Sequence, residues 1–499
     1  MPAGREMAFM AWFVAGVIAA VVAPPALADE PSELVEALES AVIGAIERAR
    51  PSVVAITRIR SADGVTRAVR GMPVEPDPEL DRGIGIGLGM PEVRPGFPNE
   101  AAPEFYAVPG ESGSGVVIGS QGEILTAYHL VRGARRLRVR SERAEFDAEI
   151  IAADPRTDLA VIVPRAGSNM PEPLVPLTIG TAERLRPGSF LVTLGNPYNA
   201  ARDGKATASF GILANVARRI EPPRGDNPNI RQFFQFQPTL LQLDNRLNLG
   251  MSGGAVVTLK GELVGITSSE ASASGFDAAA GYAIPLDARG RRAVASLIKG
   301  EEVEYGFIGI SLGPGANVVG RVREGTLAWK AELAPGDRIL AVGDRELADD
   351  ESALPLALAE VPAGATVTLK VLHQGQVVER RVVMSKYPVA GEVIATVRPE
   401  PWRGARIDFS SVLASTTQNT EETLELMTRG GVGVIEVAPG SPADAAGLAR
   451  GDVIAAVDGK PVATPAEFRG AVADRAGKPV KLTVRSGLDE EREVVVEGL

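Results

Sequence analysis

The chain of 499 residues contains no cysteine, so it can form neither a disulfide bond nor a thiol-linked lipid anchor. It has only two histidines, His129 and His373, which lie far apart in the sequence. A metal would therefore have to be bound by carboxylate and backbone oxygen atoms. We expect no metal and no cofactor, and a fold whose stability comes from packing alone.

Positive charge is also in short supply. The 52 Lys and Arg residues are outnumbered by 63 Asp and Glu residues, which leaves a formal net charge of −11. Because no basic run is present, nucleic acid is not an expected partner, and an acidic surface also disfavours anionic membranes. The length is compatible with three or four domains.

The scarcity of histidine draws attention to His129, because a general base that works near neutral pH is most often a histidine. His373 lies in a polar turn between two alternating apolar runs and is interpreted as a solvated hairpin residue. A lone histidine is more often a packed or surface residue than a catalytic one. The role of His129 therefore depends on whether suitable partners follow.

Two such partners are present downstream of His129. Ser252 lies in the glycine-rich stretch 250–254, and a nucleophilic serine needs such surroundings because the backbone must turn sharply and aim N–H groups at an oxyanion. Asp158 opens an apolar run that predicts a buried strand, whereas Asp154 precedes a proline and is typical of a turn. The order His, Asp, Ser is that of chymotrypsin. An ordinary glycine-rich turn is the alternative for 250–254.

The segment from about residue 112 to residue 286 resembles the protease domain of the HtrA/DegP family of trypsin-like serine proteases. Six short blocks carry this resemblance and occur in the family's order. They begin at Ser112 (SGSGVVI), Gly122 (GEILTAYH), Asp154 (DPRTDLAV), Leu194 (LGNPY), Gly250 (GMSGG) and Gly281 (GYAIP). The resemblance implies a mostly β fold with a chymotrypsin-like double β-barrel, expected over residues 29–300, and peptidase activity.

The triad template assigns a role to each residue. Ser252 attacks a peptide carbonyl, His129 acts as general base and then as general acid, and Asp158 fixes the imidazole tautomer. The backbone N–H groups of Gly250 and Ser252 form the expected oxyanion hole.

Three residues beside Ser252 depart from the family pattern. Met251 replaces the usual asparagine, and Leu249 and Ala255 stand where proline is common. Met251 cannot make the polar contacts of an asparagine side chain. We therefore expect the oxyanion loop either to be held by other groups or to collapse without an activator.

The N-terminal residues 1–28 are typical of a secretory signal peptide. Arg5 precedes an apolar stretch at 7–23, and the small residues Ala26 and Ala28 suit a cleavage site before Asp29. A periplasmic or secreted location follows, with an uncleaved membrane anchor as the alternative. Residues 32–49 have the apolar spacing of an amphipathic helix, and the Gly- and Pro-rich residues 62–110 predict a long flexible loop.

An internal repeat follows the protease segment. The pattern Leu-x-x-Gly-Asp-x-Ile occurs at Leu333–Ile339 and again at Leu448–Ile454. Both copies resemble PDZ domains, which we expect over residues 301–390 and 391–499. Such modules bind an extended C-terminus by strand addition and hold its carboxylate with backbone N–H groups.

The first copy contains a good match to the carboxylate-binding loop of these modules. Its residues are Tyr305, Gly306, Phe307, Ile308, Gly309 and Ile310. The corresponding stretch of the second copy is 402–407, where Arg406 replaces the expected glycine, so that peptide binding is not predicted there. Unfolded polypeptides and protein C-termini are the expected partners, and packing without a ligand is the alternative for both copies.

Two further loops have family counterparts. Residues 218–237, with Phe233, Phe234 and Phe236, occupy the position of the family's sensor loop or else form a structural hairpin. Residues 268–279 are expected to line the primary specificity pocket, where Glu270 replaces an apolar residue, so the cleavage preference is not predicted. The family also implies a trimer-based homo-oligomer, to which Phe105 and Tyr106 could contribute.

Two functions remain open on the sequence. One is an exported, ATP-independent serine endopeptidase of protein quality control that cleaves unfolded or mislocalised proteins and is regulated by PDZ peptide binding. The other is a catalytically weak or inactive pseudoprotease, a chaperone-like scaffold that binds peptides. A small-molecule esterase is disfavoured because two peptide-binding modules would serve no purpose in it.

Overall fold

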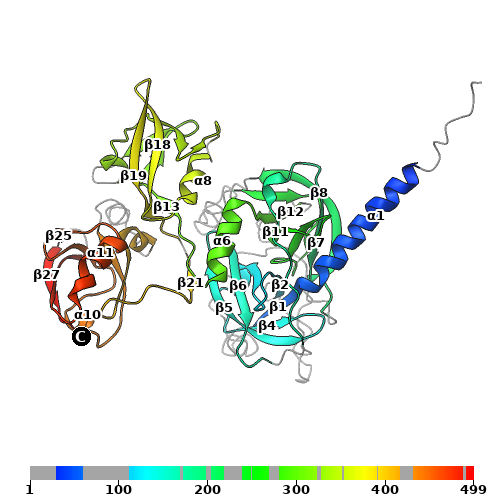
Figure 1. Cartoon of the computed structure of the whole chain (residues 1–499), viewed down its shortest axis with the longest axis horizontal. Coiled ribbons are helices and arrows are strands. Elements are labelled where there is room, and N and C mark those ends of the chain that lie inside the picture. The colour runs from blue at the N-terminus through cyan, green and yellow to red at the C-terminus, as the bar shows by residue number, and fades with distance from the viewer. Residues whose placement is uncertain are drawn as a thin grey trace, which may run out of the picture.

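The computed structural model shown in Figure 1 describes most of the chain. The described residues are 30–59, 112–168, 172–197, 204–218, 239–248, 250–268, 280–322, 327–350, 353–389, 391–415, 431–486 and 490–498. The predicted signal peptide and the loop 62–110 lie outside these ranges. So do nearly all of the expected sensor loop 218–237 and specificity loop 268–279, together with Phe105 and Tyr106.

The first barrel is formed by strands from the N-terminal half of the chain. They are β1 (Val53–Ile59), β2 (Ser112–Val117), β3 (Ile124–Ala127), β4 (Arg136–Arg140), β5 (Glu145–Asp154) and β6 (Leu159–Pro164). They follow the order β5-β4-β1-β2-β3-β6, and an additional antiparallel pairing of β5 with β6 closes the barrel. Strand β1 is buried on both faces, because Val54 and Ile56 fill this barrel while Val53 packs into the core shared with the second barrel.

The second barrel is closed in the order β10-β11-β12-β9-β8-β7. Its strands are β7 (Phe190–Gly195), β8 (Thr207–Arg218), β9 (Leu240–Leu243), β10 (Ala255–Thr258), β11 (Leu263–Ser268) and β12 (Gly281–Pro285). Ala255 pairs with Leu194, so the turn that precedes β10 lies at the end of β7. The turn that contains Ser252 is thereby placed at the junction of the two barrels.

Two helices flank the barrels. Helix α1 (Glu30–Ala49) agrees with the helix predicted at 32–49; it buries Ala45 and Ala49 but leaves Leu34 and Val35 exposed. Helix α6 (Ala288–Ile298) begins at the Asp287 cap and runs between the barrels and the following unit. None of the helices in the described ranges is long and apolar enough to cross a membrane.

The repeat predicted in the C-terminal part appears as two similar β-rich units. The first contains β13 (Gly306–Phe307), β14 (Ile310–Leu312), β15 (Val319–Val322), α7 (Leu327–Lys330), β16 (Arg338–Val342), β17 (Arg345–Glu346), α8 (Ala353–Glu360), β18 (Thr366–His373), β19 (Gln376–Val383) and β20 (Ser385–Lys386). The second contains β22 (Ala405–Phe409), β23 (Val432–Val437), α10 (Pro442–Ala445), β24 (Val453–Val457), β25 (Lys460–Pro461), α11 (Pro465–Val472), β26 (Val480–Ser486) and β27 (Glu490–Val496).

The Gly-Asp pair of the repeat has the same structural task in both units. Asp337 Oδ2 accepts a 2.9 Å hydrogen bond from the backbone N–H of Ala334, and Asp452 Oδ2 accepts one of 2.9 Å from Ala449. His373 lies at the end of the β18–β19 hairpin as predicted, but it is not simply solvated. Its Nδ1 atom lies 2.7 Å from Oδ1 of the buried Asp337.

The segment between the two units returns to the first barrel. Strand β21 (Ile394–Ala395) pairs antiparallel with β5, with Ile394 opposite Ala153 and Ala395 opposite Ala152. It thus extends the first sheet at the β5 edge, and Figure 1 shows it beside the barrel, away from the unit it precedes. The predicted mostly β fold, a double barrel followed by two smaller units, is confirmed.

Candidate active site

The local structure around His129 and Asp158 follows directly from the strands. His129 lies in the short helix α3 (Tyr128–Val131) that follows β3, and Asp158 lies in the tight turn between β5 and β6. Asp158 has a φ of +57°, a left-handed conformation that aspartate tolerates better than most residues. Because β3 pairs with β6, with Ala127 opposite Leu159, the two turns lie side by side.

The imidazole of His129 is held against the carboxylate of Asp158. His129 Nδ1 lies 2.8 Å from Asp158 Oδ2 and 3.0 Å from Oδ1. The backbone N–H of His129 donates to Oδ1 at 2.9 Å, and the backbone N–H of Tyr128 donates to the Asp158 carbonyl at 2.9 Å. Asp158 is fully buried, so its acceptor role fixes the proton on Nδ1 and leaves Nε2 free of a proton in the neutral ring.

The turn that carries Ser252 depends on glycine. Gly250 and Gly253 have φ values of +91° and +81°, where side chains are strained. A Cβ at Gly253 would lie 2.1 Å from the Ser114 carbonyl oxygen and 3.2 Å from the backbone nitrogen of Ala127. The turn therefore packs directly against the end of β3, two residues before His129, and Ser252 is 2% exposed.

The backbone of this turn is held by two buried hydroxyl groups. Thr267 Oγ1 donates to the Met251 carbonyl at 2.5 Å and accepts from the Gly254 N–H at 2.9 Å. Ser114 Oγ donates to the Gly250 carbonyl at 2.7 Å and accepts from the backbone N–H of Asn196 at 2.8 Å. Both hydroxyls donate to backbone carbonyl groups, so these hydrogen bonds do not depend on the side chain at position 251.

Met251 is itself buried, at 3% exposure. Space around it is tight, because a Cβ at Gly195 would lie 3.3 Å from the Met251 Cβ. The side chain at position 251 thus contributes packing, while Ser114 and Thr267 supply the polar contacts. Neither residue was predicted to support the turn, and only the position of Ser114 in the block 112–118 indicated a role.

The two barrels are joined at this point. The backbone N–H of Ser114, on β2 of the first barrel, donates to the carbonyl of Ser252 at 2.8 Å. Ser114 thereby links the half-site that contains His129 and Asp158 to the turn that contains the serine. The three residues predicted for the triad all lie at the junction of the barrels, where Asp158 and Ser252 are buried and the His129 side chain is 19% exposed.

Asp154 occupies the turn that leads to Asp158, as predicted from the following proline. It ends β5, and its carboxylate accepts from the backbone N–H of Thr157 at 3.0 Å and from Thr157 Oγ1 at 2.6 Å. Burial raises the pKa of Asp154, against the opposing effect of these hydrogen bonds and of one from Tyr305. A buried aspartate with this many donors holds the whole turn in one shape.

The two expected carboxylate loops differ in their backbone. In the first, Gly309 has a φ of +79°, and no described residue accepts a hydrogen bond from the N–H of Ile308 or Gly309. In the second, the N–H of Ala405 donates to the Trp402 carbonyl at 2.8 Å, and the reverse bond is also 2.8 Å. In the second loop, the backbone groups of Trp402 and Ala405 are thus already hydrogen-bonded to each other.

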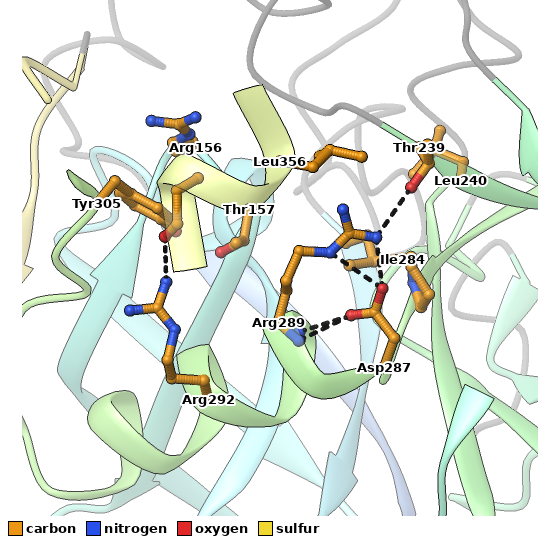
Figure 2. A pocket seen from close by; sticks show the side chains of 13 residues that line it. Arg156, Thr157, Thr239, Leu240, Ile284, Asp287, Arg289, Arg292, Tyr305 and Leu356 are labelled. Carbon is orange, nitrogen blue, oxygen red and sulfur yellow. Dashed lines mark hydrogen bonds and ion pairs between the residues drawn. The ribbon is translucent and has the colours of Figure 1, made fainter. Parts of the chain in front are cut away.

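Tyr305 stands apart from the other residues of the first loop. Its side chain is 6% exposed and reaches into the core of the barrels, not toward the rest of the loop. Figure 2 shows it beside Arg156 and Thr157 in a pocket that Asp287 and Arg289 line on the other side. Among the described residues, no cluster of histidine and carboxylate side chains is arranged to hold a metal ion.

Comparison with known proteins agrees with this geometry. Residues 113–266 match the trypsin-like peptidase domain, and residues 318–372 and 433–486 match the PDZ domain. A probable periplasmic serine endoprotease DegP-like of Chlamydia trachomatis is 30% identical over 393 residues, which cover 75% of this chain and 72% of that protein. The periplasmic serine endoprotease DegP of Salmonella typhimurium is 28% identical and covers 72% of this chain and 70% of its own length.

Among solved structures, the HtrA-type protease AlgW with decapeptide is 24% identical, covers 72% of this chain and 99% of its own, and has a TM-score of 0.47. The family assignment depends on the similarity in sequence to the chlamydial protein, which covers 75% of this chain and is thus far longer than the matched peptidase region 113–266. The chain belongs to the HtrA/DegP family of serine endoproteases, with a trypsin-like peptidase domain followed by two PDZ domains.

Proposed function

We propose that this serine endoprotease is an exported, ATP-independent enzyme of protein quality control that cleaves unfolded or mislocalised proteins with the triad His129, Asp158 and Ser252. The observation that carries the proposal is the buried Asp158 carboxylate, which holds His129 Nδ1 at 2.8 Å beside the glycine-rich turn of Ser252. The turn of Ser252 packs against Ala127, two residues before His129, which places a candidate nucleophile beside the paired histidine.

The chemistry follows from these positions. With its proton fixed on Nδ1, His129 can accept the Ser252 proton at Nε2 as the oxygen attacks a peptide carbonyl, and later deliver that proton to the leaving amine. The Asp158 carboxylate stabilises the imidazolium that forms. The N–H groups of Gly250 and Ser252 stabilise the oxyanion, and each donor contributes about two to three powers of ten to the rate.

The alternative, an inactive scaffold, rests on Met251. If an asparagine side chain were needed to shape the oxyanion loop, Met251 would leave it without polar support. The hydrogen bonds from Ser114 and Thr267 to the carbonyls of Gly250 and Met251 argue for a loop held without that side chain. We therefore favour an active enzyme.

For peptide recognition, we propose that the first PDZ domain binds protein C-termini through the backbone of Gly306, Phe307, Ile308, Gly309 and Ile310. Tyr305 belongs to this stretch by sequence, but its hydroxyl contacts the protease domain. The second PDZ domain is a weaker candidate, because Trp402 and Ala405 already use each other's backbone groups.

The periplasmic relatives support export by a cleaved signal at residues 1–28. The apolar residues Leu34 and Val35, 73% and 64% exposed on α1, support a homo-oligomer that covers this helix. We keep 29–300, 301–390 and 391–499 as the domain boundaries.

A fluorophosphonate probe tests the central claim. We expect covalent labelling of Ser252 in the full-length protein and no labelling of Ser252→Ala or His129→Ala. Absence of labelling in the wild type, even with unfolded protein and a C-terminal peptide present, would favour the scaffold. Cleavage of casein compared with a nitrophenyl ester separates an endopeptidase from an esterase.

A further inference from the structure

The turn that leads to Asp158 is contacted by residues from beyond the protease domain. The Tyr305 hydroxyl donates to Asp154 Oδ2, and the two side chains are only 6% and 1% exposed. Because both residues are buried, the carboxylate depends on its protein donors. Tyr305 lies at the entrance to the first PDZ domain, 151 positions along the chain from Asp154.

A second contact reinforces the first. The Arg156 guanidinium lies 4.3 Å from the ring centre of Tyr305 and 4.2 Å from that of Tyr387, so it is sandwiched between two aromatic rings. The backbone N–H of Tyr387 donates to the Tyr305 carbonyl at 2.7 Å, which keeps the two rings in register. Figure 2 shows Arg156, Tyr305 and Thr157 grouped on one side of the pocket.

These contacts reach Asp158 through one residue. Asp154 Oδ2, which accepts from Tyr305, also accepts from the N–H and the hydroxyl of Thr157. Thr157 directly precedes Asp158, whose left-handed φ of +57° makes the direction of its carboxylate sensitive to the shape of the turn. A shift of Asp154 would therefore move the acceptor that orients His129.

The segment between the PDZ domains supports the same turn from its other end. The N–H of Thr396 donates to the carbonyl of Ile151 at 3.0 Å, and β21 pairs with the last residues of β5 before Asp154. A Cβ at Gly391, whose φ is +103°, would lie 3.1 Å from Pro155 Cβ. Two separate segments that follow the protease domain thus converge on residues 151–156.

We propose that Tyr305 is a positioning residue for catalysis. Its hydroxyl and ring hold the turn 154–157 so that the Asp158 carboxylate meets His129, while β21 holds the strand that leads into the turn. This inference rests on the proposed function but requires no peptide in either PDZ domain. It makes the start of the first PDZ domain and the segment between the two domains structural parts of the catalytic apparatus.

The test uses the full-length protein with Tyr305→Phe, which removes one hydroxyl and keeps the ring that packs on Arg156. We expect kcat to fall about 10- to 100-fold with KM within about twofold, since a small displacement of a catalytic group costs this much. The acid limb of the kcat/KM–pH profile should move to lower pH, because a poorly aligned Asp158 stabilises the His129 imidazolium less. Thr396→Pro, which removes the donor to Ile151, should shift both readouts in the same direction.

Ser411→Ala is the matched control. Ser411 is 1% exposed, and its hydroxyl donates to the Lys386 carbonyl at 2.6 Å at the junction of the PDZ domains. Its loss removes this hydrogen bond and the 3.0 Å contact with Ser385 Oγ without touching the turn, so it should lower the melting temperature and leave kcat and the pH profile unchanged. If Tyr305→Phe behaves like Ser411→Ala, Tyr305 is only structural and the inference is wrong.

An independent readout separates this inference from the proposed function. The chain has two histidines, so 15N-histidine NMR in a His373→Gln background reports His129 alone. We expect Tyr305→Phe to weaken the Nδ1–H signal of the hydrogen bond to Asp158 and to lower the titration midpoint of His129. If the wild type fails to label with fluorophosphonate, the proposed function falls, while an unchanged His129 spectrum in Tyr305→Phe would refute the positioning role.

Discussion

Replacement of Thr267 by valine tests how the nucleophile turn is held in a chain that has Met251. Valine has nearly the shape of threonine but loses the hydroxyl that donates to the Met251 carbonyl at 2.5 Å and accepts from the Gly254 N–H at 2.9 Å. Both lost bonds are buried, since Thr267 is 0% exposed. The variant thus removes polar support from the turn without leaving a cavity.

The size of the effect follows from what remains. The Gly254 N–H still donates to the Met251 carbonyl at 3.0 Å, so neither backbone group is left without a partner. The loss is then close to the net value of about 1 kcal/mol for each hydrogen bond, or about 2 kcal/mol in total. If this energy acts on the geometry that presents Ser252 and the oxyanion donors, the rate falls about 30-fold.

The assay is the rate of fluorophosphonate labelling of Ser252, together with kcat/KM on an unfolded protein substrate. Thr258→Val is the control, because Thr258 Oγ1 accepts from the backbone N–H groups of Lys260 at 3.2 Å and Glu262 at 3.4 Å in the neighbouring β10–β11 turn, away from Ser252. We expect the control to label at the rate of the wild type. Wild-type labelling by Thr267→Val would refute the idea that this hydroxyl replaces the missing asparagine contacts.

Three further predictions concern other buried groups. Gly253→Ala should abolish labelling of Ser252, because its Cβ would lie 2.1 Å from the Ser114 carbonyl oxygen; labelling at even a tenth of the normal rate would contradict this. Lys386→Met should lower the free energy of unfolding by about 2–3 kcal/mol in calorimetry, because it removes a buried cation that pairs with the half-buried carboxylates of Glu302 and Asp408. Lys481→Met, which removes an exposed ion pair with Glu493, should cost less than about 1 kcal/mol, and equal losses for the two variants would be inconsistent with the burial of Lys386. Burial raises the pKa of Asp154 in the folded state above its value in the unfolded chain. Between these two pKa values the folded state binds more protons, so the contribution of Asp154 to stability falls as the pH rises through the folded-state pKa. Urea unfolding of Asp154→Asn should therefore lose this fall of stability with pH, and an unchanged slope would show that Asp154 is not its source.

Much of the candidate site was predictable because it depends on residue types that the chemistry requires. His129, Asp158 and Ser252 could be chosen from their neighbours, the scarcity of histidine and their order, and the structure pairs the first two directly. The turn at Asp154 followed from the proline after it. These signals are local, and local backbone geometry is what a sequence pattern encodes best.

The supports of the site could not be predicted in the same way. Ser114 and Thr267 are ordinary strand residues by sequence, and only the closure of the two barrels brings their hydroxyls to the Ser252 turn. His373 shows the same limit, since its hairpin position was predicted but its contact with Asp337 was not. Each of these contacts joins residues that are distant in the sequence, so no local sequence pattern predicts it.

By itself, the sequence determined the order of the peptidase and PDZ domains and the residues proposed for catalysis, because these depend on side-chain type and on local turns. Only the tertiary structure decided how those residues are held. In the folded chain, Tyr305, which was expected in a peptide-binding loop, donates a hydrogen bond to the buried Asp154, and β21 pairs with the edge of β5. The physical reason is that burial and hydrogen bonding across strands depend on which surfaces meet in the folded chain.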